Sequence, residues 1–257
     1  MKKILSLLFV LVLSLSFIAC GSTKVKGELV TDPEDIQNYF EDLEYSDISY
    51  KFTIKYDGLE KDYYSKAVEK YTVKGTFNYE EEDDMPVLVS FKYTANRSVK
   101  ETEATIDGKK KATSTEKASV VFDGEYVYDS YEYTDKSPDY SESDKELTCW
   151  DVEEHPNTPS LMSLVSGAEL GSIVSRLSSA SMSGQCFLDG DNMTIVVSDN
   201  ASHTVIVIKC DGSDIKSIDI TVETADSSYS LQIKTCDPVD IEEPKDSSKY
   251  EDLEDRD

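Results

Sequence analysis

The sequence predicts an α+β fold in which helices accompany an antiparallel sheet. Apolar residues recur at helical spacing in two regions of the chain, and they alternate with polar residues through most of the remainder. The alternating stretches follow one another with short turns between them. Neighbouring strands should therefore pair as an antiparallel meander, with one face buried and the other wet.

The first predicted element is a helix that Asp32 caps and that Pro33 opens. Its apolar face is formed by residues at helical spacing: Ile36, Phe40 and Leu43. A second helical region begins near Thr158. Gly167 and Gly171 divide its apolar residues into two stripes, which predicts two short helices or one kinked helix.

Strands are predicted for most other segments. Between residues 50 and 94, aromatic and apolar residues alternate with Lys, Thr and Ser, as in strands with one solvent face. The more polar stretch 97–118 predicts a long hairpin that turns at Asp107-Gly108. Four further strands are expected near the C-terminus, at residues 193–197, 204–209, 215–223 and 229–235.

The first 20 residues have the features of a lipoprotein signal peptide. Lys2 and Lys3 precede an apolar run that is too short to span a bilayer as a helix. The segment around Cys20 resembles a bacterial lipobox, which implies cleavage after Ala19 and a lipid attached to Cys20. The chain is then expected at the extracytoplasmic face of the cell membrane, held by its acyl anchor. The alternative is an ordinary secretory peptide cut at the same bond.

The rest of the chain is divided by composition. Residues 1–19 are the predicted signal peptide, 20–30 a lipidated tether and 31–240 a single domain. Residues 241–257 form an acidic tail that is predicted to be disordered. With 52 acidic and 26 basic residues the net charge is -26. This charge argues against nucleic acid as a partner, and it predicts that the body stands off an anionic membrane.

No catalytic, metal or cofactor site is expected. The chain has only two histidines, and metal sites built on histidine need more. Ser114, Ser198 and Lys234 begin segments that imitate the motifs of serine β-lactamases, but the first lies in a predicted strand where that chemistry needs a helix. An even number of cysteines in an exported protein favours two disulfides without indicating how they pair, and the alternative is four reduced, buried cysteines: Cys149, Cys186, Cys210 and Cys236.

The layout resembles the envelope lipoproteins of the LolA/LprG-like (LppX-type) superfamily. It shares a lipobox, an amphipathic helix that opens the domain, and a meander with a helical insertion before the last strands. Residues 237–244 also look like the Val-x-Ile-x-x-Pro ending of these proteins. The resemblance covers residues 31–245 as a pattern. It implies a strongly curved antiparallel sheet, an unclosed barrel, with helices packed across its concave face.

The same resemblance implies a function, because such proteins hold an acyl chain or a whole lipid between sheet and helices. The residues expected to line this cavity act by burial alone: Phe52, Ile54, Phe77, Phe91, Leu164, Ile173 and Leu177. The alternative is a surface interaction or adhesion lipoprotein with a filled core. It would contact an unknown protein partner through its acidic turns or through a tyrosine-rich strand: Tyr126, Tyr128, Tyr131 and Tyr133.

Overall fold

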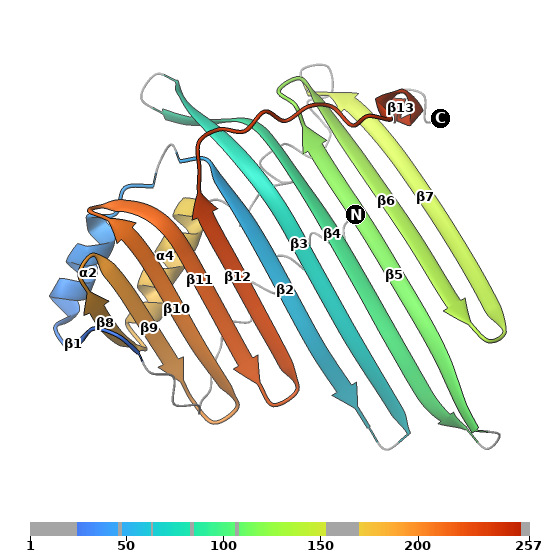
Figure 1. Cartoon of the computed structure of the whole chain (residues 1–257), viewed down its shortest axis with the longest axis horizontal. Coiled ribbons are helices and arrows are strands. Elements are labelled where there is room, and N and C mark those ends of the chain that lie inside the picture. The colour runs from blue at the N-terminus through green and yellow to red at the C-terminus, as the bar shows by residue number, and fades with distance from the viewer. Residues whose placement is uncertain are drawn as a thin grey trace. The chain divides into compact units, whose positions relative to one another are not determined.

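The computed structural model describes residues 25–252, except 46–47, 63, 83–84, 106–107 and 153–169. These residues form thirteen strands and two α-helices (Figure 1), so the chain is mostly antiparallel β rather than evenly α+β. The chain divides into two compact units, where the sequence predicted one domain. Unit 1 comprises residues 1–46 and 156–225, and unit 2 comprises residues 47–155 and 226–257.

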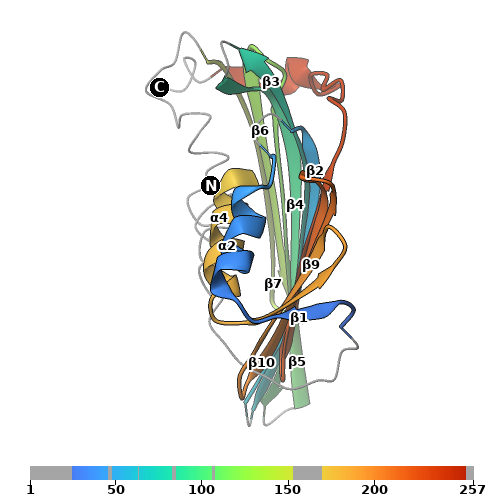
Figure 2. The same ribbon diagram turned by 90° about the vertical axis from the view of Figure 1, so that its left-hand side faces the viewer.

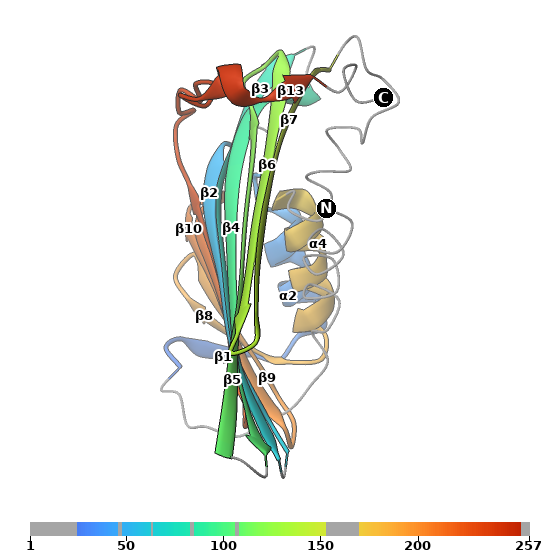
Figure 3. The same ribbon diagram turned by 90° about the vertical axis from the view of Figure 1, so that its right-hand side faces the viewer.

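Unit 1 contains five strands and both helices. The strand order is β1 (Glu28–Val30), β8 (Gln185–Asp189), β9 (Asn192–Ser198), β10 (Ser202–Asp211) and β11 (Asp214–Thr224), and every pair is antiparallel. Helices α2 (Pro33–Glu41) and α4 (Leu170–Ser181) contact each other and lie on one face of these strands (Figure 2 and Figure 3). That face is aliphatic and fully buried, with Met193, Ile195, Ile206, Ile208 and Ile218.

The sequence signals for the two helices are confirmed where the structure describes them. The Asp32 carboxylate accepts a hydrogen bond of 3.0 Å from the Glu34 amide and so caps α2. The Tyr39 hydroxyl donates to the Asp191 carbonyl at 3.1 Å, which holds α2 against the turn after β8. In α4 one predicted stripe is buried: Leu170, Ile173, Val174 and Leu177. The earlier part of this helical prediction lies outside the described residues.

Unit 2 is a sheet of long strands. Its order is β12 (Ser227–Thr235), β2 (Tyr50–Lys61), β3 (Ser65–Glu82), β4 (Met85–Thr105), β5 (Gly108–Phe122), β6 (Tyr126–Ser137), β7 (Tyr140–Asp151) and β13 (Glu251–Asp252). All pairs are antiparallel except β13 with β7. The predicted long hairpin is confirmed as β4 and β5, in which Thr105 pairs with Gly108.

Both ends of the chain are more structured than the sequence predicted. Three residues of the predicted tether form β1, which pairs with β8. The predicted disordered tail runs along unit 2 as far as Asp252, with a turn of 3-10 helix at Ser247–Lys249 and then β13. The tail contributes apolar side chains within its acidic sequence, because Ile241 is buried and Tyr250 packs edge-on against Tyr128.

The prediction of two disulfides is wrong. All four cysteines of the described chain are free thiols, and Cys186 is buried among apolar neighbours in unit 1. Cys210 lies 3.5 Å from the Tyr39 hydroxyl, so its sulfur is engaged in helix docking rather than in a cross-link. Burial raises the pKa of each thiol, which keeps all four protonated at neutral pH.

Candidate ligand-binding face and an acidic groove

Four of the predicted lining residues share one face of unit 2, which we call the aromatic face. Phe52 and Ile54 lie on β2, Phe77 on β3 and Phe91 on β4, and all four are buried. The Phe77 ring centroid is 5.5 Å from that of Phe52 and 5.6 Å from that of Phe91. These separations are typical of favourable aromatic pairs. The strand alternation therefore placed these residues correctly relative to one another.

The other three predicted lining residues are not part of the described strands of unit 2. Ile173 and Leu177 are buried in α4, which belongs to unit 1. Leu164 lies outside the described residues. The structure thus brings together the sheet half of the predicted site and leaves the helical half as a prediction.

A glycine makes room for the cluster. Gly75 is the cross-strand partner of Phe52, and the Phe52 ring lies over it. A Cβ atom built on Gly75 would come within 3 Å of that ring. An alanine at this position would therefore displace Phe52, so the flat packing of the aromatic face depends on the missing side chain.

The apolar end of the aromatic face is a single row of cross-strand neighbours, which we call the apolar row. It crosses six strands: Tyr50, Phe77, Phe91, Phe122, Val127 and Trp150. Each of these residues is at most 5% exposed. The predicted lining residues included only Phe77 and Phe91 of this row, because an alternating pattern shows which residues share a strand face but not which strands become neighbours.

Six residues further along β3, the same face carries a row of polar side chains, the polar row. It consists of Tyr229, Tyr56, Tyr71, Arg97, Glu116, Tyr133 and Asp144. The Arg97 guanidinium is 2.5 Å from Glu69 and 2.7 Å from Glu116. The aromatic face therefore changes from apolar to charged over about 20 Å, the rise of six strand residues.

Tyr71, in the polar row, has an unusual hydroxyl. The residue is 3% exposed, and among the described residues its hydroxyl has no hydrogen-bond partner. Burial raises its pKa to about 12, with a further increase from Glu116 and an opposing effect of Arg97. The phenol is therefore neutral and able to donate. Buried polar atoms almost always have a partner in folded proteins, so this one marks a place for an acceptor.

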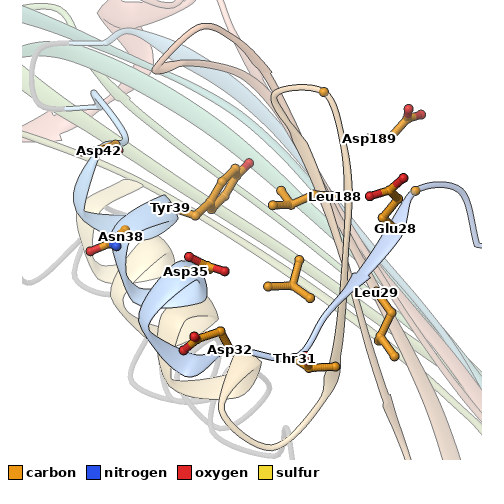
Figure 4. A pocket seen from close by; sticks show the side chains of 13 residues that line it. Glu28, Leu29, Thr31, Asp32, Asp35, Asn38, Tyr39, Asp42, Leu188 and Asp189 are labelled. Atoms are coloured by element: carbon orange, nitrogen blue, oxygen red, sulfur yellow. The ribbon is translucent and has the colours of Figure 1, made fainter.

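Unit 1 contains a groove of about 820 Å³ between β1, the start of α2 and the turn after β8 (Figure 4). Carboxylates dominate its rim: Glu28, Asp32, Asp35, Asp42 and Asp189. It is therefore unlike the predicted apolar cavity. Within the described residues no group of three acidic, histidine or cysteine side chains could hold a metal ion.

One wall of this groove depends on Gly27. Its φ of +106° lies in the region that favours glycine, and a Cβ atom there would be 2.5 Å from the Leu188 carbonyl oxygen. The close approach of β1 to β8 therefore requires this residue.

The tyrosine-rich strand does not form one surface. On β6, Tyr126 and Tyr128 point to the side opposite the aromatic face, and Tyr131 and Tyr133 point to the aromatic side, because successive side chains alternate. Tyr128 is buried, and its hydroxyl donates to Glu243 in the C-terminal segment at 3.3 Å. The tyrosine-rich strand therefore has two tyrosines on each side, and its role in contacting a partner stays a prediction.

One serine–histidine contact was not predicted. Ser198 and His203 face each other across the β9–β10 hairpin, with the Ser198 Oγ atom 3.0 Å from His203 Nδ1. The contact lies on the exposed end of a hairpin and away from the groove residues. It gives no reason to revise the expectation that the protein is not an enzyme.

Known proteins give no family or functional assignment for this chain. No family model matches the chain, and no curated protein matches it. A porin-like protein from Bacteroides uniformis ATCC 8492 is 11% identical, covering 76% of this chain and 98% of its own, with a TM-score of 0.21. Similarity at this level supports no inference about fold or function. No helix in the described part of the chain is long and apolar enough to span a membrane.

Proposed function

We propose that the chain is a lipid-anchored, extracytoplasmic protein that binds a lipid or another amphiphile on the aromatic face of unit 2. The observation that carries this proposal is the combination of a contiguous apolar row with a buried donor that lacks a partner, the Tyr71 hydroxyl. The ligand's apolar tail runs along the strands, from the apolar row towards the polar row about 20 Å away. Its polar head accepts a hydrogen bond from Tyr71.

The polar row also limits the class of head group. Arg97 is already neutralised by Glu69 and Glu116, with the three charges summing to one negative charge. This excess negative charge would repel an anionic head group, so the site favours a neutral or zwitterionic head with a strong acceptor oxygen. Burial of the tail supplies the affinity, at about 25 cal/mol for each Å² removed from water. No covalent step, cofactor or metal is involved.

The proposal includes the finer form of the predicted fold, a strongly curved and unclosed sheet with helices across its concave face. Two observations support it. In unit 1, α2 and α4 lie on one face of the strands. In unit 2, the aromatic face is the buried face. Anchoring through an acyl group on Cys20 is part of the same proposal, and Cys20 lies outside the described residues.

Native mass spectrometry tests the proposal directly. Residues 21–257, produced in a bacterial host without the anchor, are expected to carry a discrete adduct of lipid mass that is lost on denaturation. The full chain extracted from membranes is expected to carry the mass of an acyl anchor on Cys20. A clean protein mass, unchanged after incubation with membrane lipid extract, would contradict ligand binding and leave the anchor as a separate result.

A further inference from the structure

The side of unit 2 opposite the aromatic face is basic. On β12, β2, β3 and β4 the outward positions carry exposed lysines, which we call the lysine face: Lys234, Lys51, Lys55, Lys74, Lys92 and Lys100. Threonine and serine lie between them, for example Thr53, Thr72 and Thr94. A chain with a net charge of -26 therefore presents a large positively charged surface.

Carboxylates are nearly absent from the outward positions of these four strands. The acidic C-terminal segment crosses the same side at one end, where the Asn78 side chain donates to the Val239 carbonyl at 2.6 Å. Over residues 228–234, 51–61, 66–78 and 92–104 the outward positions include one acidic residue, Asp57, and Lys70 pairs with it at 2.5 Å. None of the six lysines forms an ion pair with another described residue. In contrast, the other acidic residues over these ranges lie on the aromatic side, as Glu60, Glu69 and Glu101 do.

The arrangement is unfavourable for folding alone. Lys51 and Lys234 are direct cross-strand partners, and like charges in that position destabilise a sheet. Lys92 lies in the same row, separated from Lys51 by Thr76. Like charges that lie side by side without a compensating contact inside the molecule suggest that these lysines bind something outside it.

We propose that the lysine face docks onto the headgroups of an anionic bilayer. This inference rests on the proposed lipid anchor, which holds the chain at a membrane. The lysines extend across four strands as well as along them, so a planar surface can contact all of them at once, whereas a single extended polymer would follow one line. The outward positions of these strands also lack the aromatic side chains on which nucleic-acid bases stack.

The overall charge does not prevent this contact. At physiological ionic strength the screening length is about 8 Å, so carboxylates on the aromatic side of unit 2 contribute little at the lysine face. The standoff predicted from composition therefore applies to the acidic surfaces of the molecule and not to this one.

Vesicle binding by the non-acylated chain, residues 21–257, tests the inference. Cosedimentation is measured with vesicles of phosphatidylcholine alone and of phosphatidylcholine mixed with phosphatidylglycerol, at low and at physiological salt. We expect binding only to the anionic vesicles, weakening as salt rises. Replacing Lys51, Lys74 and Lys92 by Gln should lower the partition coefficient at least tenfold, because each lysine near an anionic surface contributes about fivefold.

A matched control removes three lysines that are paired elsewhere. Lys209, Lys216 and Lys249 each contact a carboxylate, and replacing them by Gln changes the net charge equally. Binding within about twofold of the parent chain is expected for this control. Equal losses in both triple variants, or no binding of the parent chain, would overturn the inference.

Binding to soluble polyphosphate with no binding to vesicles would also overturn it, by assigning the face to a polymer. Because this assay uses non-acylated protein and no amphiphile in solution, its failure leaves the anchor and the aromatic face unaffected.

Discussion

The two units bury their sheets with different chemistry. In unit 1 the covered face is aliphatic, with isoleucines of β9, β10 and β11 beneath two helices. In unit 2 the buried face is built from rings that contact one another across strands, and it ends in a charged row. The isoleucine side chains of unit 1 have no polar atoms and need only packing partners. The aromatic face instead ends at the Tyr71 hydroxyl, which has no hydrogen-bond partner among the described residues. In the proposed function, unit 1 is chiefly structural and unit 2 holds the ligand.

The two faces of each sheet differ as well. In unit 1 the uncovered side still carries half-buried valines, such as Val205 and Val207. In β12, β2, β3 and β4 of unit 2 the two sides separate by charge, with lysines on one and most carboxylates and all aromatic rings on the other. A sheet whose sides differ in this way is suited to contact two different partners, an amphiphile and an anionic surface in this proposal.

The largest expected effect comes from the rings of unit 2. Phe77→Ala should lower the free energy of unfolding by about 3–5 kcal/mol, because it removes a fully buried ring that contacts two others. Ile206→Ala in unit 1 is the comparison, at about 2–5 kcal/mol. Urea denaturation of both variants measures this. A loss below about 1 kcal/mol for Phe77→Ala alone would show that the aromatic face is loosely packed.

Arg97→Leu should destabilise by about 2–3 kcal/mol, because Glu69 and Glu116 then face each other without a cation. Arg97→Lys should recover only part of this, since an ammonium group cannot offer the two directed contacts of a guanidinium. The same urea series compares both variants with the parent chain. Full recovery with lysine would mean that charge alone matters at the polar row.

The stability of the fold at alkaline pH tests the burial of two tyrosine hydroxyls. The pKa of Tyr71 and of Tyr128 is raised to about 12. An unfolded tyrosine ionises near pH 10, so stability is complete below about pH 10 and falls as the pH rises towards 12. For Tyr71 the full loss is about 3 kcal/mol. Phenolate absorbance followed together with circular dichroism, in the parent chain and in Tyr71→Phe, measures it. The absorbance that this substitution removes should appear only as the chain unfolds, and its appearance near pH 10 in folded protein would contradict the burial of this hydroxyl.

A smaller effect is expected at the helix cap of unit 1. Asp32→Ala removes the acceptor for the Glu34 amide and should cost about 1 kcal/mol, whereas Asp32→Asn should cost less. Thermal unfolding of the two variants provides the measurement. A change of similar size in both would locate the effect in the negative charge of the groove instead of in the cap.

Elements with a strong local signal were predictable from the sequence. The period-two alternation of β2, β3 and β4 and the Asp32-Pro33 cap are both readable without knowledge of neighbours. Strand β7 was missed, because its first seven residues are exposed and it is defined by pairing along β6. The polar row and the lysine face were missed for the same reason, since each depends on the register among strands that are distant in sequence.

The net charge of the chain did not indicate the lysine face, because a net charge does not show which residues share one side of a sheet. The lysines of β2 and β3 are scattered in the sequence among acidic residues, and only strand alternation places Lys51, Lys55 and Lys74 on one side. The acidic tail was likewise assigned to disorder from composition, although Ile241 and Tyr250 have apolar contacts in unit 2. An acidic composition predicts disorder correctly only when the few apolar residues of the segment have no apolar surface to pack against.

The proposed function requires that the Tyr71 hydroxyl donates a hydrogen bond to an amphiphile lying on the aromatic face. Calorimetric titration with lysophosphatidylcholine, a single-chain zwitterionic amphiphile, tests it below the micellar concentration. Tyr71→Phe should bind about three- to tenfold more weakly at unchanged stability, because one hydrogen bond is lost and no existing partner is abandoned. Tyr128→Phe, on the opposite face, should bind like the parent chain. Equal affinity in all three proteins, or no binding by the parent, would contradict the claim.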